Sequence, residues 1–163
     1  MESLHDLYVE ELRDLYSAEK QILKALPKMA KKASHQELRV AFQNHLEATR
    51  EHVTRLETIF DELEKSPRGR TCRGMEGLLE EGEEVMEDDA EPDVMDAALI
   101  ASAQRVEHYE IAGYGTVRTY AERLGFSEQS RLLQQTLDEE GETDRLLTQI
   151  AEDRVNPDAE RAG

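Results

Sequence analysis

The chain has 163 residues, of which 38% are apolar, 5% aromatic and 35% charged, which suits one domain with a single modest core. Its 37 acidic residues outnumber the 20 basic ones and leave a net charge of −17, which repels phosphate groups, so neither nucleic acid nor an anionic membrane is an expected partner. The single cysteine, Cys72, excludes an internal disulfide and any multi-cysteine metal site. That cysteine usage and the absence of a signal peptide or long apolar run predict a cytoplasmic protein.

Apolar residues recur at helical spacing along the chain, which predicts an all-α protein. The first predicted helix covers residues 3–33 and contains Pro27, where a kink is expected. Ser34 is expected to cap a second helix that continues to Ser66 and Pro67. We expect these two helices to form an antiparallel hairpin.

The second half of the chain repeats this arrangement after a weaker stretch. Residues 67–92 have few apolar positions among many carboxylates, which predicts a crossover with a short helix. A third helix is predicted over 94–124 and a fourth over 127–154, with Ser127 as its cap, and the polar tail 156–163 is expected to be frayed. Two hairpins joined by one long crossover are typical of ferritin-like bundles. The sequence therefore predicts a ferritin-like antiparallel four-helix bundle over residues 1–155, followed by the tail.

Carboxylates interrupt the apolar stripe near the middle of three of the predicted helices. Glu19 does so in the first helix, Glu107 and Glu110 in the third, and Glu140 and Asp144 in the fourth. Residues three or four apart share a helix face, so these side chains point toward the core. A buried carboxylate is normally paired, protonated or bound to a metal.

The second helix offers imidazoles instead of an obvious carboxylate. His45, Thr49 and His52 lie on its apolar stripe, whereas Glu47 lies roughly opposite Thr49 around the helix. Oxygen ligands with one or two imidazoles suit iron, with manganese as the alternative. The predicted ligand set is Glu19, His52, Glu107, Glu110, Glu140 and Asp144.

Taken singly, members of this group could also have a purely structural role. Asp144 alone could be a residue at the boundary of the stripe, and His45 a packing group held by a hydrogen bond. Tyr114 is interpreted as a core aromatic whose hydroxyl is paired.

Four segments resemble the YciE/YciF-type bacterial stress proteins of the ferritin-like superfamily. They are LYSAEKQ (15–21), CRGMEGLLEEGEEV (72–85), RVEHYEIAGYGT (105–116) and TLDEEGETDRLLT (136–148). The resemblance covers nearly the whole chain and implies a ferritin-like bundle, a homodimer and a di-iron site like that of rubrerythrins. It supports Glu19, Glu107, Glu110 and Glu140 as ligands, and it implies no defined substrate.

The chain departs from the ferritin-like pattern in its second helix. Such proteins usually carry Glu-x-x-His in two helices, but neither Glu47 nor Glu140 is followed by histidine three positions later. Where the family resembles HLEET, this chain has HLEAT, so Ala48 stands in place of a carboxylate. His52 could supply the missing ligand, and a site for two ions or for one remains open.

Two functional hypotheses follow. In the first, a di-iron carboxylate centre reduces O2 or peroxide with electrons from Fe(II), as a ferroxidase or peroxidase-like oxidoreductase does in stress protection. In the second, the chain is a non-enzymatic helical stress protein that acts through dimerisation or partner binding, with a vestigial or structural metal site. A metal held only by the folded state stabilises it, so stability measurements distinguish the two.

Overall fold

The computed structural model describes residues 1–162, and it is helical throughout that range apart from short connections. The elements are α1 (Leu4–Lys32), α2 (Gln36–Glu62), α3 (Arg73–Glu87), α4 (Pro92–Arg123) and α5 (Ser127–Ile150), followed by a π-helical segment (Ala151–Val155) and α6 (Asn156–Arg161). The all-α prediction is confirmed. Pro27 lies inside α1, which continues to Lys32. No helix in the described part of the chain is long and apolar enough to cross a membrane.

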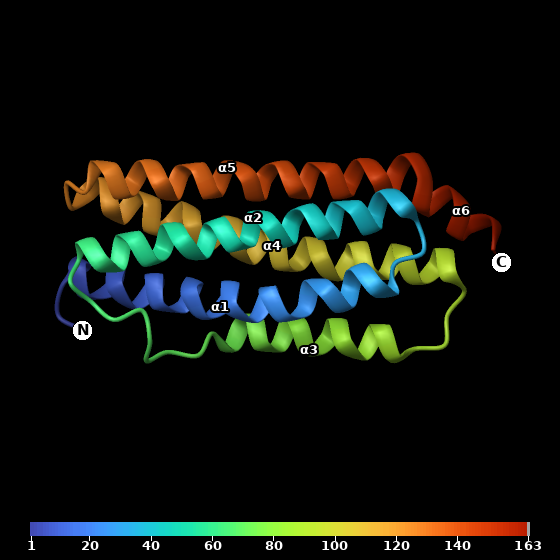
Figure 1. Cartoon of the computed structure of the whole chain (residues 1–163), viewed down its shortest axis with the longest axis horizontal. Coiled ribbons are helices and arrows are strands. Elements are labelled where there is room, and N and C mark those ends of the chain that lie inside the picture. The colour runs from blue at the N-terminus through green and yellow to red at the C-terminus, as the bar shows by residue number, and fades with distance from the viewer. Residues whose placement is uncertain (163) are drawn as a thin grey trace.

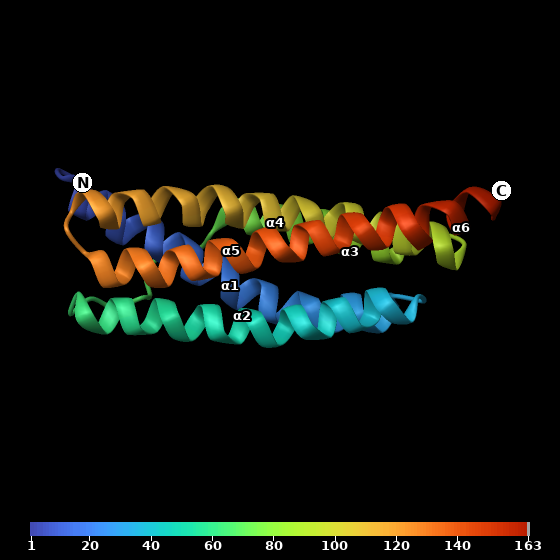
Figure 2. The same cartoon turned by 90° about the horizontal axis from the view of Figure 1, so that it is seen from above.

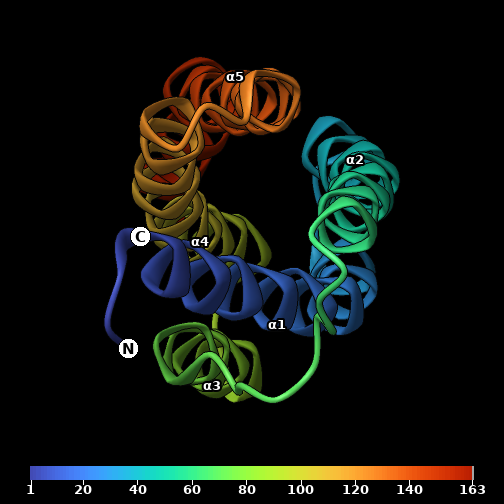
Figure 3. The same ribbon diagram turned by 90° about the vertical axis from the view of Figure 1, so that its left-hand side faces the viewer.

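The four long helices form an antiparallel bundle of two hairpins. Helix α1 pairs with α2 and α4 with α5, while α1–α4 and α2–α5 contacts join the hairpins (Figure 1 and Figure 3). Helix α2 ends at one end of the bundle and α4 begins at the other, so the chain must return along its length. It does so through α3, which packs on the outside against α1 and α4. The predicted long crossover with a short helix is therefore confirmed.

The start of α2 is capped differently from the prediction. Its N-cap residue is His35, which makes no side-chain capping bond. The fully buried carboxylate of Asp96, from α4, instead accepts hydrogen bonds from the backbone N–H groups of Ser34 (2.8 Å) and His35 (2.7 Å). A charged acceptor from a neighbouring helix thus takes the role predicted for the Ser34 hydroxyl. Ser127, also predicted as a cap, lies inside α5, whose N-cap Phe126 makes no side-chain bond.

The C-terminal segment, where a frayed tail is predicted, is helical as far as Arg161. Helix α5 continues through the π-helical segment into α6, as Figure 2 shows. Val155 is fully buried, and α6 contacts α4. Pro157 lies in the first turn of α6, a position that its fixed φ favours. Buried Val155 therefore holds the start of this segment, and the helix continues to Arg161, while Gly163 lies outside the described residues.

The apolar core is divided into two clusters along the length of the bundle. On α1 one cluster ends at Leu15 and the other begins at Ala18, and on α4 they are separated between Val106 and Tyr114. Glu107 and Glu110 fall in this gap on α4, Glu140 lies between Leu133 and Leu147 on α5, and Glu19 directly follows Ala18 on α1. The bundle thus carries a polar layer at mid-height, between two apolar halves.

Candidate metal centre

Six buried donor residues from four helices form the polar layer. They are Glu19 of α1, His45 and His52 of α2, Glu107 and Glu110 of α4, and Glu140 of α5. None of these residues is more than 6% exposed. Each lies on the inward stripe of its helix, so the spacing that builds the apolar core also directs these polar groups to one level.

Glu19, His52 and Glu140 make up the first of two trios within the layer. Nδ1 of His52 lies 2.9 Å from Oε1 of Glu140 and 3.2 Å from Oε1 of Glu19. Nδ1 nevertheless makes no hydrogen bond to either oxygen. Neighbouring ligands of an octahedral ion with bonds of about 2.1 Å lie about 3.0 Å apart. The spacing therefore fits ligands gathered around a cation.

The second trio shares Glu140 with the first. Nε2 of His45 lies 2.9 Å from Oε1 of Glu107 and 3.9 Å from Oε2 of Glu140. In each trio the donor atoms lie within 4.8 Å of one another. Glu140 is the only residue common to both trios, and its two oxygens face different histidines. The layer thus offers two adjacent sets of donors joined by one carboxylate.

Most of the unsatisfied buried polar atoms of the described chain lie in this layer. Across residues 1–162, eight buried side-chain nitrogen or oxygen atoms have no hydrogen-bond partner. Seven of them belong to Glu19, His52, Glu107, Glu110 and Glu140. Because buried polar atoms are almost always paired in native proteins, this concentration is typical of donors arranged to hold a charged partner. Carboxylate and imidazole donors together suit iron or manganese, so the residues present fit such an ion.

The pKa values of the carboxyl groups reflect the crowding of negative charge. Burial raises the pKa of Glu107 to about 7. Burial and the neighbouring carboxylates raise the pKa of Glu110 and Glu140 well above the usual range. Burial also acts to raise the pKa of Glu19, but its contacts with His52 outweigh that effect and lower it. Without a metal, protons therefore supply part of the missing positive charge.

The two imidazoles respond to the layer in opposite directions. Burial acts to lower the pKa of His52, but its contacts with Glu140 and Glu19 outweigh that effect and raise the pKa to about 11. Burial lowers the pKa of His45, so this ring is neutral at pH 7. A metal ion would have to displace the extra proton of His52, which makes metal binding dependent on pH.

Three further residues hold the donors in place. The Tyr114 hydroxyl donates to Oε1 of Glu19 at 2.6 Å, in agreement with a core tyrosine whose hydroxyl is paired. Nε2 of His52 donates to Oε2 of Glu139 at 2.8 Å, and the Arg55 guanidinium binds both oxygens of Glu139 at 2.7 and 2.9 Å. A proton kept on Nε2 leaves Nδ1 of His52 free to face Glu19 and Glu140.

The structure brings most of the predicted ligands together. Glu19, His52, Glu107 and Glu140 form the trios. Glu110 is buried beside them but belongs to neither trio, and both of its oxygens lack partners. Asp144 lies outside the trios.

Asp144 is occupied by other contacts. It accepts a hydrogen bond from Gln104 at 3.1 Å and lies 3.2 Å from Nε2 of His108. Thr49 is fully buried, but its hydroxyl donates to the backbone carbonyl of His45, so it offers no free donor.

Sequence reasoning missed His45, Arg55 and Glu139 as parts of this site. His45 lies on the apolar stripe, where the sequence leaves a packing role open beside a ligand role, although its spacing of seven residues from His52 places both rings on one face. Glu139 is 31% exposed and lies beside the stripe, so its role has no periodic signal. Ala48 is half-buried and contributes no donor, which leaves both histidines as the contribution of α2.

Comparisons with known proteins agree with this architecture. Residues 3–160 match a family described as a domain of unknown function, DUF892. The chain is 45% identical over 161 residues to Protein YciF of Escherichia coli, covering 98% of this chain and 97% of that protein. The crystal structure of the E. coli stress protein YciF superposes with a TM-score of 0.92, covering 96% of this chain and 99% of that one.

Two further solved structures share the fold. YcfI from Rhodopseudomonas palustris is 41% identical, with a TM-score of 0.88 over 91% of this chain and 94% of that one. A protein from Xanthomonas campestris is 22% identical, with a TM-score of 0.78 over 98% of this chain and 99% of its own, and this likeness shows the fold alone. The chain therefore belongs to the DUF892 family, in agreement with its resemblance to YciE/YciF-type stress proteins.

Proposed function

We propose that this chain is a stress protein that binds two iron ions in the polar layer and uses them to reduce O2 or peroxide. The proposal is supported above all by the two buried trios that share Glu140. One trio alone would suit a single ion, whereas two sets joined by a carboxylate suit a pair. Manganese is the alternative metal, because it accepts the same oxygen and nitrogen donors.

The residues of the chain would divide the work of holding these ions. Glu19 and His52 would bind one ion, His45 and Glu107 the other, and Glu140 both. Glu110, whose two oxygens lack partners, is available to either ion. Bound as Fe(II), the pair supplies two electrons to O2 or to peroxide.

The surrounding residues would keep the centre ordered and dry. Tyr114 orients Glu19, and Glu139 with Arg55 orients His52. The apolar clusters on both sides exclude bulk water from the layer, which strengthens the electrostatic attraction between the carboxylates and a cation.

The test is an anaerobic Fe(II) titration of the metal-free protein, with metal analysis per chain, followed by exposure to O2 and separately to peroxide. We expect close to two ions per chain and an absorbance change on oxidation. Glu140→Ala should reduce binding of both ions, because this residue belongs to both trios. Glu142→Ala is the matched control, since Glu142 is exposed on the same helix.

Three results would contradict parts of this proposal. Binding of one ion per chain would contradict the pair while keeping a metal site. Binding of two ions without oxidation by either oxidant would contradict the redox role. An absence of binding, with melting unchanged by Fe(II), would favour a non-enzymatic protein that acts through partner binding.

A further inference from the structure

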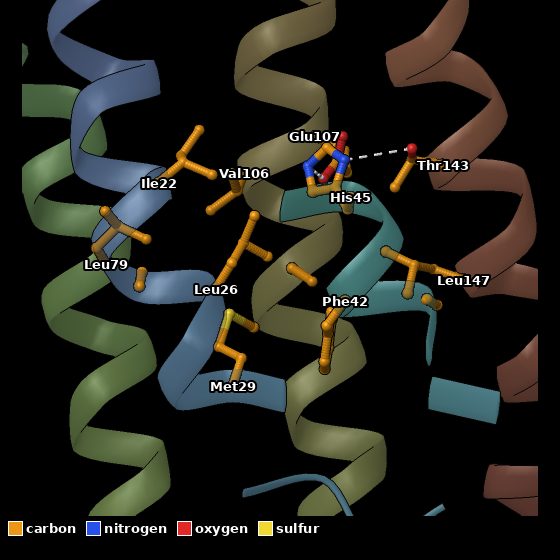
Figure 4. Close-up of a pocket in the computed structure, with 13 residues that line it drawn as sticks. Ile22, Leu26, Met29, Phe42, His45, Leu79, Val106, Glu107, Thr143 and Leu147 are labelled. Carbon is orange, nitrogen blue, oxygen red and sulfur yellow. Dashed lines mark hydrogen bonds and ion pairs between the residues drawn. The ribbon is translucent and has the colours of Figure 1, made fainter. Parts of the chain in front are cut away.

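A small apolar cavity lies beside the half of the layer that contains His45 and Glu107 (Figure 4). Its volume is about 20 Å³, and on this scale a cavity of about 10–15 Å³ holds one water-sized molecule. Most of its wall is made of apolar side chains from five helices, which include Leu26, Met29, Phe42, Leu79, Val106 and Leu147. The cavity therefore has room for a very small molecule in direct reach of the candidate ligands.

The polar groups of the cavity gather at one end, where most of their polar atoms contact one another or the backbone. Figure 4 shows His45, Glu107 and Thr143 together at that end. Nε2 of His45 lies 2.9 Å from Oε1 of Glu107, and the Thr143 hydroxyl donates to the backbone carbonyl of Glu139 at 3.1 Å. Oε2 of Glu107 is the one buried carboxylate oxygen here without a hydrogen-bond partner.

This distribution of polar atoms disfavours a polar occupant. An ordered buried water needs two to four polar partners, and apolar cavities that lack them stay dry but accept apolar ligands such as xenon. Hydrogen peroxide has hydrogen-bonding needs at least as large as those of water, so burial against this wall would leave its hydroxyl groups unpaired. Dioxygen is of comparable size and has no such need.

We propose that this cavity is a binding site for dioxygen at the edge of the polar layer. The biological role of this cavity rests on the proposed function. The cavity narrows the choice of oxidant in that function, because it accommodates O2 rather than peroxide. Binding itself needs only the apolar wall, so it is expected in the metal-free protein as well.

The first experiment measures gas binding without any metal. Methyl NMR spectra of the metal-free protein are recorded under increasing xenon pressure and, separately, under O2, whose paramagnetism broadens the signals of nearby methyl groups. We expect saturable xenon shifts and O2 broadening at the methyl groups of Leu26 and Leu147, which line the cavity. Absence of a saturable response at these methyl groups would overturn the proposal.

Filling the cavity provides the matched comparison. Ala103 lines the cavity and is buried, whereas Ala101 is exposed on the same helix. Ala103→Leu should weaken xenon binding by at least about tenfold, equivalent to about 1.4 kcal/mol, and Ala101→Leu should leave it unchanged. Ala41→Leu, which fills the cavity from α2, serves if overpacking prevents Ala103→Leu from folding. Unchanged xenon binding in a folded, filled variant would contradict the assignment.

The second experiment separates this proposal from the proposed function. In Fe(II)-loaded protein, Ala103→Leu should slow oxidation by O2 and leave oxidation by peroxide unchanged, and equal slowing of both reactions would contradict selection for O2. If xenon and O2 bind to the metal-free protein but Fe(II) is not oxidised, the proposed function fails and the gas site stands. If Fe(II) is oxidised but the cavity methyl groups do not respond to gas, the gas site fails alone.

Discussion

Glu107→Gln tests whether the buried carboxylates of the polar layer destabilise the metal-free protein and stabilise it only when a metal ion is bound. Burial raises the pKa of Glu107 from 4.5 to about 7. Between these values the folded chain holds a proton that the unfolded chain has released, so stability falls as pH rises through this range. Each pKa unit corresponds to about 1.4 kcal/mol in the free energy of unfolding, and the whole shift corresponds to about 3 kcal/mol.

The glutamine variant keeps the shape of the side chain and removes its titration. Metal-free Glu107→Gln should match the parent near pH 4 and become more stable than the parent by up to about 3 kcal/mol at pH 8, where the parent carboxylate is ionised. With metal the order should reverse, because the variant has lost a ligand. An ion at 100 times its dissociation constant stabilises the parent by about 2.7 kcal/mol, and this gain should be smaller in the variant.

Urea denaturation at pH 4, 6 and 8 measures both effects, once with chelator and once with Mn(II), which avoids oxidation during the experiment. Glu142→Gln serves as a control for loss of an exposed carboxylate on α5. Equal pH dependence of the metal-free parent and Glu107→Gln would refute the assignment of a raised pKa to this group. An equal gain from Mn(II) would refute its role as a ligand.

Three further substitutions test the surroundings of the layer. Glu139→Gln weakens the contact that orients His52, so metal affinity measured by chelator competition should fall about 10- to 100-fold. An unchanged affinity would show that Glu139 does not support the site. Asp144→Asn should leave that affinity unchanged, because Asp144 lies outside both trios, and a clear loss would instead make it a ligand. Asp96→Asn should lower the free energy of unfolding by about 1–3 kcal/mol, because it weakens buried hydrogen bonds to backbone N–H groups. Thermal and urea melts measure this loss, and the metal affinity of the folded variant should stay the same.

The sequence determined the helical elements and the order in which they connect, because apolar periodicity is a local property of the chain. The stretch around 67–92 has few apolar positions among many carboxylates, which was enough to predict a crossover with a short helix, and that helix is α3. The break of the stripe at Glu19, Glu107, Glu110 and Glu140 was equally local, so helical spacing alone places these four carboxylates inside the bundle, where all four are buried.

Tertiary structure decided which polar groups meet, because contact depends on helix rotation and register between segments far apart in the chain. The sequence places both His45 and Asp144 on the apolar stripes of their helices. In the structure His45 contacts Glu107, whereas Asp144 contacts Gln104 and His108. Asp96 contacts the start of α2 across 62 positions, and Glu139 meets His52 across 87. No local pattern encodes such pairs. Composition and spacing determined that the bundle would hold carboxylates in its interior, and only the packing of its helices decided that two histidines would join them in trios sharing Glu140.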